Sequence, residues 1–146
     1  MRIVLQRVSR AQVCVDGDVL GSIGRGWVVL LGIGRADDSA AVSRMVGKVC
    51  DLRAFEDEAG KTNRSARDVG AEFLVVSQFT LYADTSRGRR PSYVDAALPD
   101  IAEPLVREFT TQLAQRGFAV ATGQFGSVMD VELVNSGPMT IVLNTD

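Results

Sequence analysis

Residues Trp27–Ile33 form an uninterrupted apolar run, and this run constrains the fold more than any other feature of the sequence. The run has the length of a strand and lacks polar alternation, which is typical of a strand buried on both faces. We therefore expect it at the centre of a sheet. A chain of 146 residues can bury the core that such a sheet requires, and we expect one domain over residues 1–146.

The N-terminal residues are predicted to form antiparallel β-structure. Arg2–Val8 and Ala11–Val15 have the composition of strands. Asp16-Gly17 readily supplies positive φ, so it predicts a tight hairpin turn before a further strand at Val19.

Two later segments have the apolar spacing of helices that pack on a sheet. The apolar positions of the first are Val42, Met45, Val46, Val49 and Cys50, and those of the second are Ala102, Leu105, Val106, Phe109 and Leu113. Asp37 or Asp38 is expected to cap the first helix. Gly117 is expected to end the second. Pro104 leaves the start of the second helix open, either near Asp100 or later, with the proline in the first turn.

The remaining apolar segments are predicted strands separated by polar turns and loops. The expected strands are 52–56, 72–81, 118–122, 128–134 and 139–143, with a turn at 57–60 and loops at 61–70 and 84–91. The predicted fold is α+β, with a mostly antiparallel sheet curled into a partial barrel and two amphipathic helices. Edges of such a sheet need cover, and a homodimer would provide it.

The chain contains no histidine, and this absence excludes most familiar hydrolase mechanisms. Cys14 and Cys50 are far apart in the sequence and match no metal-binding spacing, so we expect reduced thiols and no metal. The apolar run near Met1 is too short for a signal peptide, and no apolar segment is long enough to span a membrane. We expect a cytoplasmic protein.

Sixteen basic and eighteen acidic side chains give a net charge of −2, which does not predict a strong, sequence-independent grip on nucleic acid. Any such contact must be local. Arg87, Arg89 and Arg90 form the one dense basic cluster, and arginine side chains suit forked contacts with phosphate.

The segment Ser77-Gln78-Phe79-Thr80 interrupts an apolar strand with three hydrogen-bonding side chains, those of Ser77, Gln78 and Thr80, just before a loop. Strand ends of this kind commonly carry ligand-facing groups. The competing interpretation, favoured by spacing alone, is that Ser77 and Thr80 bond to nearby backbone while Gln78 faces water. A serine hydrolase is excluded, because Ser77 lacks the glycines of a nucleophile elbow and has no base.

Asn135-Ser136-Gly137-Pro138 is the second candidate site. A cis Gly137–Pro138 bond would direct two adjacent carbonyls so that they can accept hydrogen bonds from an ammonium group. A plain turn between two strands is the alternative, and composition alone favours it.

Three motifs together resemble the D-aminoacyl-tRNA deacylase family: Ser77–Asp84, Gly88–Pro91 and Asn135–Thr140. Shorter matches fall at 6–8, 15–17, 52–57 and 123–126, so the likeness spans the chain. In the family pattern we expect a basic residue at position 124, and Gln124 departs from it. The departure implies a weaker RNA contact at this position. Ser136, Met139 and Thr62 are smaller departures.

The resemblance implies a homodimer that hydrolyses D-aminoacyl-tRNA and mischarged glycyl-tRNA without a cofactor. The implied catalytic residues are Ser77, Gln78, Phe79 and Thr80, around the ester and the 3′ end of the charged tRNA. The implied substrate-binding residues are Gly137, Pro138, Arg7 and Met129. Carbonyls of a Gly-cisPro element from the partner subunit would hold the α-amino group and exclude an L side chain. The alternative is a non-catalytic homodimer that binds RNA or another ligand in the same cleft.

Overall fold

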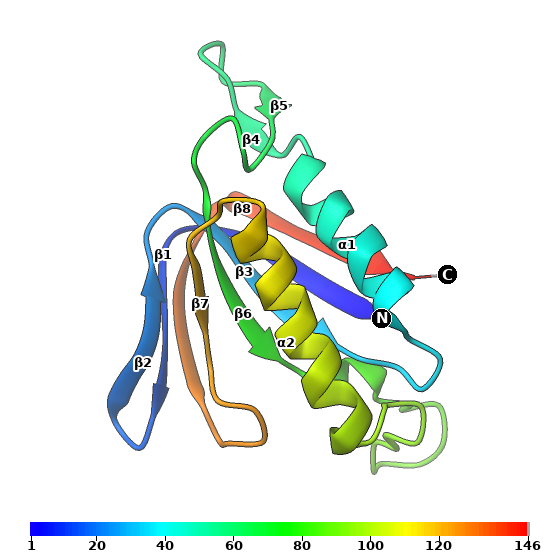
Figure 1. Cartoon of the computed structure of the whole chain (residues 1–146). Helices are drawn as coiled ribbons and strands as arrows, with labels where there is room; N and C mark the ends of the chain where they lie inside the picture. The colour runs from blue at the N-terminus through cyan, green and yellow to red at the C-terminus, as the bar shows by residue number, and fades with distance from the viewer. Residues whose placement is uncertain (146) are drawn as a thin grey trace.

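The computed structural model describes residues 1–145 and contains a curved sheet with two helices on one face (Figure 1). The elements in chain order are β1 (Arg2–Val15), β2 (Asp18–Ile23), β3 (Gly26–Gly32), α1 (Ser39–Asp51), β4 (Phe55–Glu56), β5 (Thr62–Arg64), β6 (Glu72–Ser77), the 3₁₀ helix η1 (Phe79–Tyr82), α2 (Pro99–Gln115), β7 (Val120–Thr122) and β8 (Asp130–Asn144). The strand order is β2-β1-β3-β6-β7, and β8 pairs with the other edge of β1.

β3 lies at the centre of this order, as the Trp27–Ile33 run predicts, and Trp27, Val28 and Val29 are fully buried. The sheet is mixed: β1 runs antiparallel to β2, β3 and β8, whereas β3–β6 and β6–β7 are parallel. The parallel pairs arise because a helix lies between the paired strands along the chain, returning each strand in the same direction. A nearly closed barrel results, since β2 closely approaches β7.

The predicted N-terminal hairpin and both predicted helices are present. Asp16 and Gly17 take φ of 51° and 88° at the β1–β2 turn. The Asp38 carboxylate accepts a hydrogen bond from the Ala41 N–H and caps α1. α2 begins at Pro99, so the earlier of the two expected starts is correct, and Gly117 follows its end with φ of 89°.

Several predicted boundaries are wrong. Arg2–Val15 is one strand rather than two, because irregular pairing with β8 carries the chain through residues 9 and 10. β8 is likewise continuous through the expected turn at 135–138. The predicted strand 72–81 ends at Ser77, where the chain coils into η1, and the predicted loop 61–70 contains β5, which pairs with β4.

The core has two parts, one on each face of the sheet. The larger part lies between the sheet and the helices and includes Trp27, Phe55, Phe73 and Phe109. The smaller part fills the concave face around Val28 and Leu74. No helix within residues 1–145 is both long and apolar enough to cross a membrane.

Candidate active site

The end of β6 presents the polar group predicted from the sequence. Ser77 is the last residue of this strand, and the backbone N–H of Gln78 donates to the Leu31 carbonyl of β3 over 2.8 Å. This bond ties the turn into η1 to the central strand. Ser77 and Gln78 are half-buried and Phe79 is 57% exposed, so the strand end faces outward from a rigid sheet.

Within this turn, the side-chain amide of Gln78 donates a hydrogen bond to the hydroxyl oxygen of Thr80. The hydroxyl is therefore the acceptor, and the amide cannot remove its proton. The first hydrogen bond of η1 runs from the Leu81 N–H to the Gln78 carbonyl over 3.3 Å. The N–H groups of Phe79 and Thr80 precede this bond, so the turn itself provides them with no acceptor.

A cavity of about 360 Å³ opens beside this strand end. Its walls are mainly apolar and come from the ends of β3 and β6, η1, the loop before α2, the first half of α2 and the β7–β8 connection. They comprise Leu31, Ile33, Ser77, Gln78, Phe79, Tyr93, Ala96, Ala97, Leu98, Pro99, Ala102, Val106, Phe125 and Gly126. The Phe79 and Tyr93 rings meet edge to face with centroids 5.0 Å apart.

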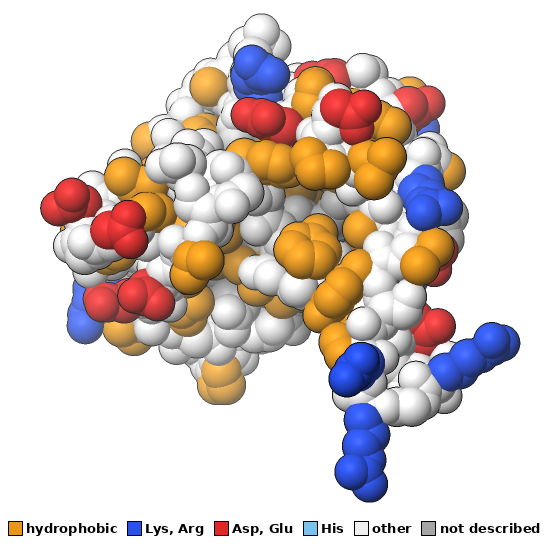
Figure 2. Space-filling view, turned by 90° about the horizontal axis from the view of Figure 1, so that it is seen from below, with side chains coloured by type: hydrophobic (Ala, Val, Ile, Leu, Met, Phe, Trp, Pro, Cys, Tyr) orange, Lys and Arg blue, Asp and Glu red, His pale blue; other side chains and the backbone are white. Residues whose placement is uncertain are grey.

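The view from below shows hydrophobic side chains gathered around a hollow, with long basic side chains projecting from one edge (Figure 2). Arg87, Arg89 and Arg90 are exposed on the loop that follows η1. Asp84 and Ser92 close this loop with two backbone hydrogen bonds of 2.7 and 2.9 Å. Hydrogen bonds from the Ser86 side chain and backbone N–H hold the pKa of Asp84 below its usual value.

Gly137 and Pro138 lie within β8 rather than in a turn. The expected cis bond is wrong, because residues 1–145 contain no cis peptide. The trans form is the intrinsically favoured one, by about 0.5–1 kcal/mol, and it lets β8 continue along β1. Gly137 has φ of 114°, a backbone conformation that L side chains rarely adopt.

The segment around Gly137 is fixed by Arg7, which is only 6% exposed. The Arg7 guanidinium donates through Nε to the Ser136 carbonyl over 3.1 Å and through Nη1 to the Ala54 carbonyl over 2.6 Å. Its Nη2 lies 3.5 Å from a carboxylate oxygen of Glu56. The Asn135 amide donates to the Arg7 carbonyl over 2.9 Å, so the two strands are locked together at this point.

A single chain does not bring the two candidate sites together. Gly137 and Pro138 lie opposite the Gln6–Val8 stretch of β1, level with the start of β3, whereas Ser77 pairs with Leu31 near its end. The separation is about four residues along the strands and three strand spacings across them, or roughly 20 Å over the sheet.

Met129 lies near the β6 end but outside the cavity, because it packs against Gly123, whose N–H donates to the Val75 carbonyl over 3.3 Å. It is half-buried before β8 and packs on the smaller core, with its sulfur against Gly123. It does not line the cavity at the strand end. The sequence pointed to Tyr93 only as a residue that flanks the arginine cluster, and it gave no site role to Leu98 or Phe125, yet all three line the cavity. The 123–126 motif was the only signal for Phe125.

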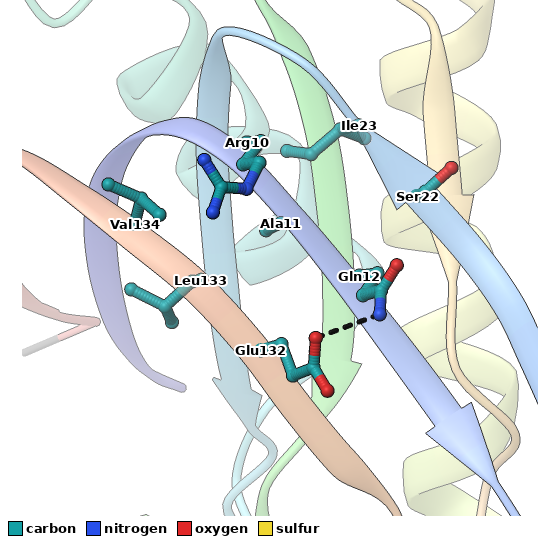
Figure 3. A pocket seen from close by; sticks show the side chains of 8 residues that line it. All are labelled: Arg10, Ala11, Gln12, Ser22, Ile23, Glu132, Leu133 and Val134. Carbon is teal, nitrogen blue, oxygen red and sulfur yellow. Dashed lines mark hydrogen bonds between the residues drawn. The ribbon is translucent and has the colours of Figure 1, made fainter. Parts of the chain in front are cut away.

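A second cavity, of about 520 Å³, lies over β1, β2 and β8 (Figure 3). Gln12 and Glu132 are paired on neighbouring strands in its wall, where the Gln12 amide donates to the Glu132 carboxylate over 2.8 Å, and Arg10 also lines it. Its lining includes none of the predicted site residues. The cavity at the β6 end is therefore the better candidate.

Comparison with known proteins identifies the family. The family described as D-Tyr-tRNA(Tyr) deacylase matches residues 4–144. The chain belongs to this family. It is 57% identical to the D-aminoacyl-tRNA deacylase of Roseiflexus castenholzii over 99% of this chain and 92% of that protein. It is 54% identical to the D-aminoacyl-tRNA deacylase of Symbiobacterium thermophilum over 100% of this chain and 97% of that protein.

Two solved structures share this fold. One, named "c-Myc DNA Unwinding Element Binding Protein", has a TM-score of 0.94 and 41% identity, covering 100% of this chain and 99% of that one. Another, described as a probable eukaryotic D-amino acid tRNA deacylase, has a TM-score of 0.86 at 17% identity, with 97% of each chain covered, and supports the fold. The family expected from the sequence and the assignment of the chain as an enzyme are both confirmed.

Proposed function

We propose that this protein hydrolyses the ester bond of D-aminoacyl-tRNA and mischarged glycyl-tRNA, releasing the amino acid and the tRNA. The observation that carries the proposal is the strand end at Ser77–Thr80, which lies at an apolar cavity in a chain of the D-Tyr-tRNA(Tyr) deacylase family. Residues 1–146 act as one deacylase domain, and the expected location is the cytoplasm, where aminoacylation occurs.

The cavity suits the terminal adenosine of the charged tRNA. Its apolar walls can bury a nucleobase, and the exposed ring of Phe79 offers a surface for stacking. The arginine loop lies next along the chain after η1, and its Arg87, Arg89 and Arg90 supply forked donors for phosphates. Local positive charge of this kind permits tRNA binding by a chain whose net charge is −2.

Hydrolysis in this site needs no imidazole. A water oxygen attacks the ester carbonyl carbon, the bond to the ribose oxygen breaks, and a proton passes to that oxygen. The ribose 2′-hydroxyl next to the ester helps orient the water, and the Phe79 and Thr80 N–H groups stabilise the oxyanion. A well-placed oxyanion donor contributes about 3–4 kcal/mol to transition-state stabilisation, and an aminoacyl ester is already activated.

The complete site requires two subunits. In the proposed homodimer, the Gly137–Pro138 backbone of the partner subunit lies over Ser77–Thr80 and accepts hydrogen bonds from the substrate α-ammonium. The separation of roughly 20 Å within one chain supports this arrangement, as does the outer edge of β8, which has no paired strand among residues 1–145. An L side chain would strike this backbone, whereas a D side chain would point outward.

Met129 is proposed to act in the same substrate-binding region, and Arg7 to hold the Gly137 backbone in place. Gln124, exposed beside the cavity residue Phe125, is proposed to weaken the RNA contact there.

The alternative is a non-catalytic nucleic-acid-binding dimer, since the 41% identical solved structure is named as a DNA-unwinding-element binding protein. Incubation with D-Tyr-tRNA and L-Tyr-tRNA separates the two, with loss of acid-precipitable label as the readout. Release of label from the D-substrate alone supports the proposed enzyme. Binding of both substrates without release would establish the alternative.

A further inference from the structure

Arg2 links β1 to η1, the turn that begins with the proposed oxyanion donors Phe79 and Thr80. It is the first residue of β1, its Nη1 donates to the Leu81 carbonyl over 3.0 Å, and its guanidinium lies 4.6 Å from the centroid of the Tyr82 ring. Leu81 and Tyr82 are the last two residues of η1. One exposed side chain therefore holds the far end of the turn that begins with Phe79 and Thr80.

Tyr82 is held from a second direction. Its ring lies against Gly34, where a Cβ atom would collide with the ring and hydroxyl of Tyr82. The Tyr82 hydroxyl lies 3.4 Å from the Asp37 carboxylate, which also accepts the Gly34 N–H over 2.7 Å. This contact joins η1 to the turn between β3 and α1.

We infer that Arg2 is a positioning residue, which fixes η1 so that the Phe79 and Thr80 N–H groups point at the developing oxyanion. The inference rests on the proposed function and adds a residue to its machinery. η1 is one turn long and lies outside the core, with none of its four residues buried. Because such a turn has no buried side chain, its orientation depends on anchors at both ends: the Gln78 N–H bond to the Leu31 carbonyl at its start and Arg2 at its far end.

A different role for Arg2 is contact with a tRNA phosphate, and the two roles predict different kinetics. A phosphate contact stabilises bound substrate and affects KM and the salt dependence. A positioning contact affects the transition state, so it changes kcat and leaves KM in place. A displacement of about 1 Å at a reacting centre can cost as much as 100-fold in rate.

The experiment compares wild type, Arg2→Ala, Arg2→Lys and Arg44→Ala on D-Tyr-tRNA and on D-tyrosyl-adenosine, which has no phosphate. Arg44 is the matched control, because it is exposed and lines the groove beside Arg2. Arg2→Ala should lower kcat roughly tenfold on both substrates, with KM and salt dependence unchanged. Arg2→Lys should recover part of kcat, since its ammonium can still donate to Leu81. Hydrogen exchange at the Leu81 and Ala83 amides, which donate to the Gln78 and Thr80 carbonyls, should rise most in Arg2→Ala and not at all in Arg44→Ala.

Three other outcomes would contradict either the positioning role of Arg2 or the proposed function. A defect confined to D-Tyr-tRNA, with a raised KM and a shallower salt dependence, would make Arg2 a phosphate contact. Wild-type kcat in Arg2→Ala would show that η1 holds its orientation without it. Inactivity of the wild-type protein on both substrates would instead refute the proposed function and is readily distinguished from these results.

Discussion

The Arg7 guanidinium occupies the space into which a side chain at Gly137 would project. A Cβ atom built on Gly137 collides with Nη2 of Arg7, and the backbone there has φ of 114°. Two independent restrictions therefore require glycine at this position. Arg7 also donates a hydrogen bond to the preceding Ser136 carbonyl. It therefore fixes the Gly137–Pro138 backbone that is proposed to exclude L side chains.

Gly137→Ala should lose deacylase activity on both D-aminoacyl-tRNA and glycyl-tRNA, because the new Cβ displaces the Arg7 guanidinium that holds the Ser136 carbonyl and the strained φ shifts the Gly137–Pro138 backbone. The positive φ alone should cost about 1–3 kcal/mol in the free energy of unfolding. Urea unfolding and deacylation assays measure the two effects. Gly60→Ala is the control, since Gly60 has φ of 73° with open space around its Cβ position. It should show strain without loss of activity.

If Gly137→Ala retained wild-type activity and selectivity for D-substrates, the Gly137–Pro138 backbone would not be the element that excludes L side chains. Selectivity would then arise from the residues around Ser77.

Local patterns predicted the elements whose signals lie within one segment. The buried strand at Trp27–Ile33 and the Asp16-Gly17 turn are both present. The wrong boundaries occur where pairing with a distant strand decides the conformation. Polar residues and proline at 135–138 favour a turn, but hydrogen bonds with β1, and those of Arg7, keep the chain in β8.

In the candidate site too, features with a local sequence signal were predicted, whereas features that depend on long-range packing were not. The polar strand end at Ser77–Thr80 was visible in the sequence because it interrupts an apolar run. Burial of Arg7 between Ala54 and Ser136 could not be predicted, because it depends on the packing of three segments far apart in the chain. The contact of Arg2 with η1 is also long-range and leaves no local pattern.

The arginine loop should account for much of the tRNA affinity. Replacement of Arg89 and Arg90 by Ala should raise KM for charged tRNA and reduce the slope of log K against log salt by about 2, if each contacts one phosphate. Deacylation kinetics from low to moderate salt measure both quantities. Lys48→Ala combined with Lys61→Ala removes the same charge at exposed positions outside the cavity lining. An unchanged KM and slope in the Arg89/Arg90 variant would place the tRNA elsewhere.

The two cysteines should react at different rates. Cys50 lies on the buried face of α1, and desolvation raises the pKa of its thiol, so little reactive thiolate is present at pH 8. Cys14 is half-buried on β1. Iodoacetamide should modify Cys14 first in the native protein and Cys50 only on unfolding, as measured by peptide mass spectrometry with and without urea. Equal labelling of both thiols in the native state would contradict the packing of Cys50.

Thr80 should not act as a nucleophile, because its hydroxyl accepts a hydrogen bond from the Gln78 amide. An amide is no base, so the hydroxyl lacks the activation that a nucleophile needs. Thr80→Ala keeps the backbone N–H groups and should lose far less than the roughly 10⁶-fold that follows removal of a true serine nucleophile. Thr80→Ser, which keeps the hydroxyl, is the control.

The ribose 2′-hydroxyl should matter more than Thr80. A substrate that ends in 2′-deoxyadenosine and is charged at the 3′ position should be cleaved poorly by wild type, because the proposed water then lacks its orienting group. Single-turnover rates on the ribo and deoxy substrates, compared for wild type and Thr80→Ala, measure the two contributions separately. Trapping of an aminoacyl ester on Thr80, or full activity on the deoxy substrate, would refute attack by a water that the ribose orients.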